Sequence, residues 1–288
     1  MKKYLAFFAA TAWLAASSPA AFTDWKTQEK EEIRRTLRFQ DAAKPGEVVV
    51  DNVWGSISVE GADIREVELV ARKTIRARNQ DRLARAKDEV KLEISESAAA
   101  VDIYVDGPFR CSEHGGKGIR FNRDPGYEVQ YDFELKVPRT ASIVLKTVMN
   151  GDVRVRNIES GFDVRNVNGR IDLEGMGGAG DAKTVNGGVR VAFRRAPAAG
   201  CAFKTINGKV DLTFPATPSA DFRLKTLNGE AWSDFPVEYL PATPGKAERK
   251  DGMFVYKSGG FTNVRSGRGG VAVEVETLNG GIYLRTAK

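Results

Sequence analysis

A short phrase that ends in Asn-Gly recurs through the second half of this chain and limits what it can fold into. Each copy has a charged residue, then Thr or Asn, then an aliphatic residue before the pair. The pairs are Asn150-Gly151, Asn168-Gly169, Asn186-Gly187, Asn207-Gly208, Asn228-Gly229 and Asn279-Gly280. Successive pairs lie 18, 18, 21, 21 and 51 residues apart. A period near twenty indicates a repeat architecture, in which each unit stacks on its neighbours.

Every repeat contains a short strand on either side of its Asn-Gly pair. After the glycine, apolar and polar residues alternate, as in Val153–Val155 and Ile171–Leu173, which is typical of half-buried strands. Before the pair, another short strand contributes an apolar residue such as Leu145 or Phe203. The repeat unit is therefore strand, Asn-Gly corner, strand and turn.

Two all-β architectures accommodate this unit. In a β-solenoid of short coils, like positions stack about 4.8 Å apart and inward residues fill a narrow core. In an antiparallel hairpin meander, each Asn-Gly is a two-residue turn, for which it is a strong signal. The sequence favours the solenoid, because the identity extends to Thr and Asn side chains, which form hydrogen-bonded ladders only when like stacks on like. The extra residue Met149 in the first copy predicts a bulge.

Stacking of the repeats also predicts how charges pair. The outward residues Arg154, Asp172, Arg190 and Asp211 alternate in sign, so neighbouring coils would present opposite charges. The residue before Thr or Asn is instead positive in the first five copies, which gives a basic row of Lys146, Arg165, Lys183, Lys204 and Lys225. Like charges about 5 Å apart repel each other unless something anionic lies alongside. The basic row is therefore a candidate binding site for an anionic glycan or lipid.

Three aromatic residues, Trp54, Trp232 and Tyr283, fall at or beside corners and outward positions. We expect them to be solvent-facing caps over apolar neighbours. A platform on which a sugar ring stacks is the alternative.

The first twenty residues have the layout of a secretory signal peptide. Lys2 and Lys3 precede an apolar run from Leu5 to Ala16 and then small residues, with cleavage expected after Ala20. A membrane anchor is the alternative, but about 12 apolar residues fall short of the roughly 20 that a spanning helix needs. We therefore expect an extracytoplasmic chain, periplasmic, cell-surface or secreted, that is not transmembrane once residues 1–20 are removed.

The remaining sequence predicts one domain after a short leader. Residues 21–40 are charged and polar, which predicts a solvated lead-in or an amphipathic helix. Residues 41–288 are expected to form a single β-solenoid domain, with a surface insertion at about 235–260 that is rich in Pro, Gly and charge. In the less regular N-terminal third, Asp81–Asp88 predicts a short helix.

The two cysteines, Cys111 and Cys201, permit a disulfide in an oxidising compartment. The alternative is a loop thiol and a small buried residue. His114, the single histidine, lies three residues after Cys111 in a Gly-rich stretch. Metal sites need three or four ligands, and nothing nearby completes such a set. We expect a plain loop there, with no metal site and no cofactor.

The net charge argues against nucleic acid as a partner. Lys and Arg exceed Asp and Glu by 44 − 38 = 6, and loss of Lys2 and Lys3 lowers the excess to four. So small an excess does not indicate nucleic-acid binding, and an exported chain has no access to nucleic acid.

The signal peptide, the segment Val50–Val59 and the recurrent Lys-Thr-Val-Asn-Gly-Gly-Val-Arg-Val phrase resemble the bacterial putative-adhesin family of exported β-strand-repeat proteins, a domain of unknown function. The likeness covers about Glu47 to Arg285. It implies an exported, right-handed parallel β-helix-like solenoid, and an adhesin role by analogy with other surface β-helices. It implies no active-site residues.

The repetition itself favours a non-enzymatic module that is adhesin-like or envelope-associated. Catalysis needs distinct residues in one place, whereas a ladder repeats the same ones. The partner would be an envelope polysaccharide, an anionic lipid or another surface protein. A carbohydrate-active β-helix enzyme is the remaining alternative, and it needs a carboxylate pair or an acidic metal site. The acidic candidates are Asp152, Asp172, Asp211 and Glu230.

Overall fold

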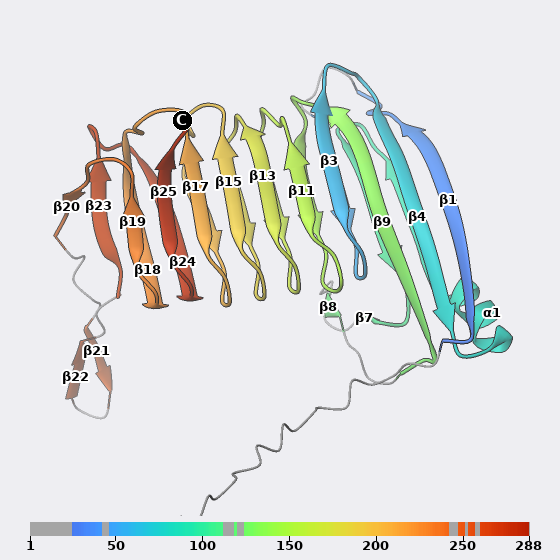
Figure 1. Ribbon diagram of the computed structural model, residues 1–288. Coiled ribbons are helices and arrows are strands. Elements are labelled where there is room, and N and C mark those ends of the chain that lie inside the picture. Colours follow the sequence, from blue (N-terminus) through green and yellow to red (C-terminus); the bar gives the residue numbers. More distant parts are fainter. Residues whose placement is uncertain are drawn as a thin grey trace, which may run out of the picture.

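The computed structural model describes residues 25–41, 46–111, 118–119, 124–241, 247–250, 253–256 and 260–287. These residues form an all-β fold built on two large mixed sheets (Figure 1). The signal peptide expected over residues 1–20 lies outside the described residues. In the described part of the chain, no helix has the length and apolar character needed to cross a membrane.

Sheet A is the ten-stranded sheet. Its strands lie in the spatial order β1 (Thr27–Leu37), β4 (Val67–Ala77), β9 (Tyr127–Pro138), β3 (Ile57–Ala62), β11 (Val153–Arg156), β13 (Ile171–Met176), β15 (Val189–Phe193), β17 (Val210–Phe214), β25 (Ile282–Thr286) and β19 (Ala231–Ser233). Strands β4 and β9 pair antiparallel, and from β9 to β19 every pair is parallel.

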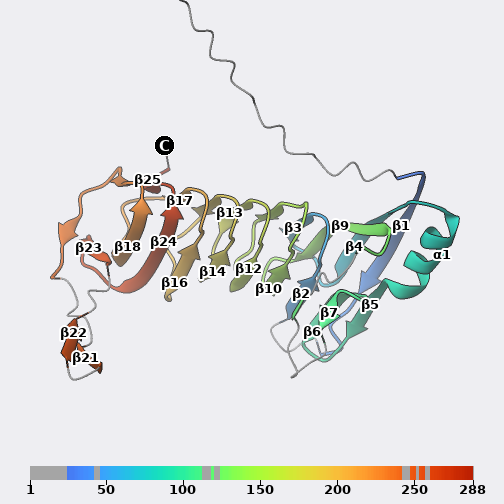
Figure 2. The ribbon, with the colours of Figure 1, turned by 90° about the horizontal axis from the view of Figure 1, so that it is seen from below.

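Sheet B has eleven strands and faces sheet A, so that Figure 2 shows the two as layers. Its spatial order is β20 (Glu238–Tyr239), β23 (Thr262–Ser266), β18 (Ala220–Asn228), β24 (Val271–Asn279), β16 (Cys201–Lys204), β14 (Gly180–Lys183), β12 (Phe162–Arg165), β10 (Ser142–Lys146), β2 (Glu47–Asp51), β6 (Ala100–Asp106) and β5 (Lys91–Glu96). Two further pairs, β7 (Arg110–Cys111) with β8 (Gly118–Ile119) and β21 (Ala247–Lys250) with β22 (Met253–Tyr256), form small separate sheets.

Successive repeats stack in parallel with like positions in register. In sheet B, β10 pairs with β12, β12 with β14 and β14 with β16, and in sheet A the strands β11, β13, β15 and β17 follow the same order. The strands on either side of each Asn-Gly pair belong to different sheets. The described pairs therefore do not form the hairpins that the meander alternative requires.

The last copy of the repeat does not lie at the end of the stack. Strand β24 lies between β16 and β18 in sheet B, and β25 lies between β17 and β19 in sheet A. The unit at Ala220–Ser233 is therefore the outer one, although it comes earlier in the chain. The chain leaves the stack through the predicted insertion, which contains β20 and the β21–β22 pair, and then returns.

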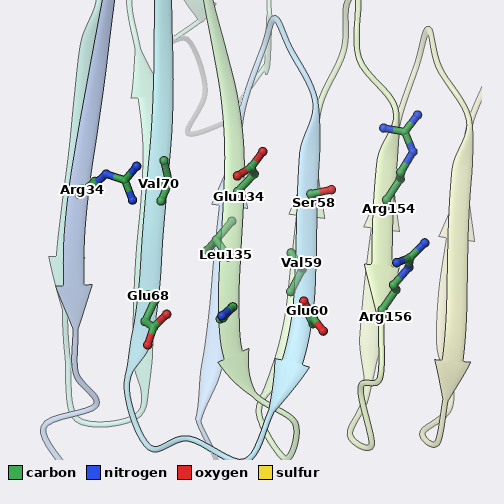
Figure 3. Close-up of a pocket in the computed structure, with 11 residues that line it drawn as sticks. Arg34, Ser58, Val59, Glu60, Glu68, Val70, Glu134, Leu135, Arg154 and Arg156 are labelled. Carbon is green, nitrogen blue, oxygen red and sulfur yellow. The ribbon is translucent and has the colours of Figure 1, made fainter.

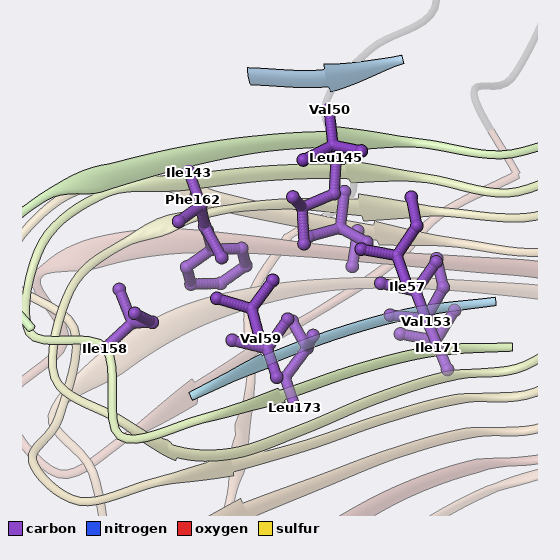
Figure 4. Close-up of a cluster of buried hydrophobic side chains, with 14 of the residues drawn as sticks. Val50, Ile57, Val59, Ile143, Leu145, Val153, Ile158, Phe162, Ile171 and Leu173 are labelled. Carbon is purple, nitrogen blue, oxygen red and sulfur yellow. The ribbon is translucent and has the colours of Figure 1, made fainter. Parts of the chain in front are cut away.

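Apolar side chains from both sheets meet in one continuous core (Figure 4). Leu145 of sheet B and Val153 and Leu173 of sheet A are fully buried. Toward the β19 end, aromatic rings fill the space, with ring centroids 5.3–6.3 Å apart among Phe193, Phe203, Phe214, Phe222 and Phe235. The alternation read from the sequence thus places the inward residues between the sheets.

A polar side chain, buried in every copy but the half-buried Thr226, ties each corner to the neighbouring repeat. Each of these Thr or Asn side chains donates to the carbonyl oxygen of a corner glycine at 2.7–3.0 Å. The pairs are Thr147 to Gly55, Asn166 to Gly151, Thr184 to Gly169, Thr205 to Gly187, Thr277 to Gly208 and Thr226 to Gly280. These bonds satisfy carbonyl groups that the turn would otherwise bury without partners.

The corner asparagines form the predicted side-chain ladder. Each Nδ2 donates to the Oδ1 of the next asparagine at 2.7 Å, in the order Asn228, Asn279, Asn207, Asn186 and Asn168. The first copy departs from the ladder, because Met149 takes the stacked position and Asn150 adopts a left-handed φ of 57°. This is the irregularity that the extra residue predicted.

Two elements of the N-terminal third, one helix and one strand, lie outside the repeats. The predicted short helix is α1 (Gln80–Glu89), which begins after Asn79, whose side chain accepts a hydrogen bond from the backbone N–H of Arg82 at 2.9 Å. The stretch predicted as a polar lead-in contains β1, so the helix alternative is wrong for residues 27–37. The charges of β1 suit an edge strand, where they discourage pairing with other chains.

Replacing a corner glycine should destabilise the stack, because a Cβ on Gly208 would lie within 3.0 Å of the Gly187 carbonyl oxygen. We expect Gly208→Ala to lower the free energy of unfolding by about 1–3 kcal/mol through overpacking. Urea unfolding measures the change. Gly200→Ala is the matched control, since its nearest atom would be at an ordinary 3.5 Å, and it should change stability by less than about 0.5 kcal/mol. Equal effects would contradict close packing at the corner.

Candidate functional site

The parallel register of sheet A lines up one row of side chains across its outer face, which points away from the core. This outer row consists of Arg34, Val70, Glu134, Ser58, Arg154, Asp172, Arg190, Asp211, Tyr283 and Trp232. It crosses all ten strands of the sheet, which is about 40 Å at roughly 4.8 Å per strand. The outer row therefore joins features that lie far apart in the sequence.

A hollow of about 520 Å³ lies at the β1 end of the outer row (Figure 3). It arises because Val70 and Ser58 are short, while the residues beside them in the row are long. Four cations and three carboxylates line it: Arg34, Lys136, Arg154, Arg156, Glu60, Glu68 and Glu134. The hollow thus offers both hydrogen-bond donors and acceptors around a small hydroxyl.

A second row of alternating charge runs beside the outer row through the hollow. Its members are Glu68, Lys136, Glu60, Arg156 and Glu174, on β4, β9, β3, β11 and β13. Arg156 lies 3.6 Å from Glu174, and both side chains are more than half exposed. Exposed pairs of this kind contribute little to stability, so their side chains remain available to a ligand.

Glu134 is held by an arginine from the neighbouring strand. Arg72 Nη1 and Nη2 donate to the two Glu134 carboxylate oxygens at 2.5 and 3.0 Å, and Arg72 also contacts Glu32 at 3.2 Å. The hydrogen bond from Arg72 lowers the pKa of the Glu134 carboxyl below its ordinary value. Glu134 is therefore an ionised acceptor at neutral pH.

The predicted charge alternation is present in the outer row. Arg154, Asp172, Arg190 and Asp211 are direct cross-strand neighbours. Arg190 lies 3.5 Å from Asp172, whereas Arg154 pairs with Asp152 in its own coil at 2.9 Å. Asp211 is nearly buried and accepts a hydrogen bond from Arg285 at 2.9 Å. The stacking of the strands therefore places opposite charges next to each other along the row. The ion pairs that form also involve carboxylates outside the row, as Arg154 with Asp152 shows.

Two aromatic rings close the other end of the outer row. Trp232 and Tyr283 stack with centroids 4.7 Å apart and planes 10° apart, and Trp232 is 45% exposed. The cationic groups of Arg285 and Lys209 lie 4.9 and 5.8 Å from the Tyr283 ring centroid. Trp54 instead packs edge-on against Phe109, 5.0 Å away, as expected for a cap. Trp232 and Tyr283 thus form an exposed flat surface on the edge strand β19.

The basic row is not an uninterrupted line of cations. Because β24 lies between β16 and β18, Glu276 separates Lys204 from Lys225 and contacts both, at 3.5 and 2.7 Å. Lys204 also pairs with Glu274, whose hydrogen bond raises the pKa of the Lys204 ammonium.

The other members of the basic row also have acidic neighbours. Arg165 pairs with Asp163 at 2.8 Å and Lys183 with Asp181 at 2.6 Å. Lys146 lies beside Asp51 in the register of β10 and β2. The expectation of five adjacent positive charges is therefore corrected, and the carboxylates weaken the row as a site for a polyanion.

The two cysteines are free, so the possible disulfide between them is not present. Arg110, next to Cys111, binds Asp51 at the end of β2, whereas Cys201 begins β16. Four strand spacings of about 4.8 Å separate β2 from β16, far beyond the roughly 7 Å that a disulfide can span. His114 lies outside the described residues.

Three of the four acidic candidates for catalysis have basic partners. Asp152 contacts Arg154 and Arg170, at 2.9 and 3.2 Å. Asp172 pairs with Arg190 and Asp211 with Arg285. Among the described residues, no group of three His, Cys, Asp or Glu side chains is placed to hold a metal ion.

The hollow and the ring stack were not predicted from the sequence. Three of the strands beneath the hollow, β1, β4 and β9, lie outside the Asn-Gly repeats, so their register is not readable from the repeat period. The ring stack could have been predicted, because Trp232 and Tyr283 both lie three residues after their corner glycines and so occupy the same position of the repeat.

No family model matches this sequence, and no curated protein matches it. Solved structures with a similar outline include a putative cell adhesion protein from Clostridium sporogenes, 9% identical over 90% of this chain and 100% of that one, with a TM-score of 0.42. A putative adhesin from Bacteroides fragilis is 11% identical over 89% and 97%, with a TM-score of 0.39. Another from Parabacteroides merdae is 8% identical over 90% and 97%, with a TM-score of 0.23.

The pair of Glu276 with its lysines should make stability depend on pH. The hydrogen bond from Lys225 lowers the pKa of the Glu276 carboxyl, and the charge of Lys204 adds to this effect. Burial acts in the opposite direction but is outweighed, so the pKa lies below its ordinary value of 4.5. A carboxyl with a lowered folded pKa stabilises the fold above its ordinary pKa and loses that contribution as the pH falls through the folded value. We expect Glu276→Gln to cost less than about 1 kcal/mol at about pH 7 and less again at about pH 3, as measured by urea unfolding.

The same substitution made together with Lys204→Gln and Lys225→Gln is the control. Without the two ammonium groups, Glu276→Gln should cause no pH-dependent difference in the urea midpoint. A cost that is the same at both pH values in the parent would show that the ion pair does not stabilise the fold.

Proposed function

We propose that this chain is a non-enzymatic, adhesin-like binding module that holds a polysaccharide along the outer face of sheet A. One observation carries the proposal: a single row in register links a polar hollow at the β1 end to the exposed Trp232–Tyr283 stack at the β19 end. The row is about 40 Å long by strand spacing. An extended polymer is the kind of ligand that makes use of both ends.

The chemistry of the hollow suits a polymer rich in hydroxyl groups. A hydroxyl both donates and accepts hydrogen bonds, and the second row offers donors and acceptors in turn from Glu68 to Glu174. The seven charges lining the hollow nearly cancel, with four positive and three negative. A neutral or weakly charged glycan therefore fits better than a strong polyanion.

The aromatic end supplies apolar contact. Sugar rings have a face of C–H groups, and a flat indole offers a matching apolar surface. Trp232 lies on the edge strand, is 45% exposed, and is held in orientation by its stack against Tyr283 on the neighbouring strand. Because the stack is already formed, little side-chain ordering would be needed when a sugar binds.

A non-enzymatic role is supported by how the acidic residues are used. Hydrolysis of glycosides needs one carboxyl group that donates a proton and a second one facing it across the bond. Asp152, Asp172 and Asp211 are engaged by arginine side chains, and the charges of the outer face recur from coil to coil. This arrangement suits binding along a surface better than chemistry at one point.

We also infer that the stacked repeats make up a right-handed parallel β-helix-like solenoid. Its support is the in-register parallel pairing within each sheet, with every Asn-Gly corner crossing from sheet B to sheet A. Right-handed crossovers are the rule for parallel strands. We place the protein outside the cytoplasm, in line with its leader sequence and with an envelope polysaccharide as its ligand.

Truncating the exposed indole should weaken polysaccharide binding. Affinity electrophoresis of the chain from Ala21 onward through gels containing β-glucan, α-mannan or polygalacturonate measures binding. We expect at least one polymer to retard the parent, and Trp232→Ala to weaken that interaction roughly 3–10-fold, the equivalent of about 0.5–1.5 kcal/mol for one aromatic contact. Arg154→Ala, at the hollow, should weaken the same interaction.

Tyr239→Ala is the matched control, because Tyr239 is an exposed aromatic residue on β20 of sheet B, at 77% exposure. It should bind as the parent does. The proposal fails if no polymer retards the parent, or if Trp232→Ala and Arg154→Ala leave retardation unchanged. Polymer that is shortened during incubation would overturn the non-enzymatic role.

A further inference from the structure

A row of aliphatic side chains runs along the corner edge of the stack, on a surface separate from the outer row. The residue before each corner asparagine is Val167, Val185, Ile206, Leu278 and Leu227 in spatial order, with Val148 preceding the first-copy bulge. Backbone hydrogen bonds join neighbours in this aliphatic edge, as from Asn186 N–H to the Val167 carbonyl at 2.7 Å. The corners line up along the lower edge of the stack in Figure 1.

The aliphatic edge is exposed at its β19 end, whereas Val148, Val167 and Val185 are half-buried. Ile206 is 43% exposed, Leu278 42% and Leu227 70%. They are three of the five large hydrophobic residues that are exposed in the described part of the chain, and they are direct neighbours. β-Branched residues suit such extended positions, but leucine has no such advantage there. An exposed apolar cluster of this kind marks an interaction surface.

Charges are ordered by their distance from the aliphatic edge. On the outer face of sheet B, the basic row lies two residues before the aliphatic edge. Two residues further back, three of the repeats carry a carboxylate, namely Asp163, Asp181 and Glu274. Two residues of a strand span about 6.6 Å. Moving inward from the corner, a flat surface would meet aliphatic groups, then cations and then carboxylates.

Two residues depart from this order: Glu276 takes the place of a cation in its repeat, and Arg223 lies beside Glu274 in the row of the carboxylates. On the sheet A side, the residues directly after the corner glycines include two cations, Arg170 and Lys209, and two carboxylates, Asp152 and Glu230. The sheet A side is therefore balanced. The attraction of cations on the sheet B side is modest, because most of them also have carboxylate partners.

We propose that the aliphatic edge lies on an anionic phospholipid surface, with Ile206, Leu278 and Leu227 inserted among the lipid headgroups. Basic side chains beside such an apolar stripe meet lipid phosphates while their stems lie against apolar surface. Carboxylates held further back avoid the negative potential of the lipid. The straight row of corners presents all coils at one depth, which matches a flat bilayer.

This surface is separate from the proposed polysaccharide site. The outer row lies on sheet A and the basic row on sheet B, so a chain bound to lipid by its corner edge would keep the outer row exposed. The two proposals are therefore tested by different ligands and different substitutions, and one can fail without the other.

Sedimentation with lipid vesicles tests the inference. The chain from Ala21 onward, which lacks the apolar leader, is mixed with phosphatidylcholine vesicles that contain about 30% phosphatidylglycerol, or none. We expect binding to the anionic vesicles, a loss of about tenfold in Leu227→Ser with Leu278→Ser, and a loss of about threefold in Lys204→Gln with Lys225→Gln. The lysine variant should lose affinity for anionic vesicles only, and added salt should reduce that loss.

Two matched controls should bind as the parent does. Tyr239→Ser removes an exposed apolar group elsewhere, and Lys30→Gln with Lys91→Gln removes two exposed charges on edge strands β1 and β5. Circular dichroism and thermal melting check that the leucine variant is folded.

The inference is overturned if the parent does not bind anionic vesicles or if the folded leucine variant binds as well as the parent. If only the lysine variant loses binding, the interaction is purely electrostatic and the aliphatic edge does not take part in it. Sedimentation velocity adds a last outcome. If the leucine substitutions convert a dimer to a monomer without changing vesicle binding, the edge is a contact between two copies.

Discussion

The close approach of successive Asn-Gly corners is the constraint on which the structure depends. At these corners the chain turns from sheet B to sheet A, and the glycine backbones lie so near each other that a Cβ would collide with the next carbonyl oxygen. The Thr or Asn before each corner then donates to that same oxygen. A contact this tight permits one register, so the spacing of the coils and the alignment of every outward row follow from it.

That register gives the molecule its distinct faces. Outward positions on sheet A become continuous rows, which place Trp232 beside Tyr283 and set Ser58 between Glu134 and Arg154. Outward positions on sheet B become bands parallel to the corner edge. A stacked scaffold of this kind presents shallow, extended surfaces, and such surfaces suit polymers and planar interfaces.

The sequence was informative where its signal is local and repeated. The Asn-Gly phrase predicted the corners, the asparagine ladder, an irregularity at the first copy and the facing of Arg154 with Asp172. It could not predict that Glu276 would lie between Lys204 and Lys225, because the place of the last copy in the sheets depends on the path of the long excursion before it. The separation of Cys111 from Cys201 and the hollow between β1 and β11 depend likewise on pairings between strands remote in sequence, which no local pattern encodes.

The slot taken by the last copy has a consequence for the order of assembly. Within the described residues, β18 pairs only with β23 and β24, and β19 pairs only with β25. When synthesis has reached Ser233, strands β18 and β19 therefore have no partner strand, because β23, β24 and β25 have not yet been synthesised. Coils up to β17 can add one by one from the N-terminal side, but completion waits for residues 262–286. The final segment joins the sheets last, and by pairing with β18 and β19 it connects a repeat that was synthesised earlier to the rest of the stack.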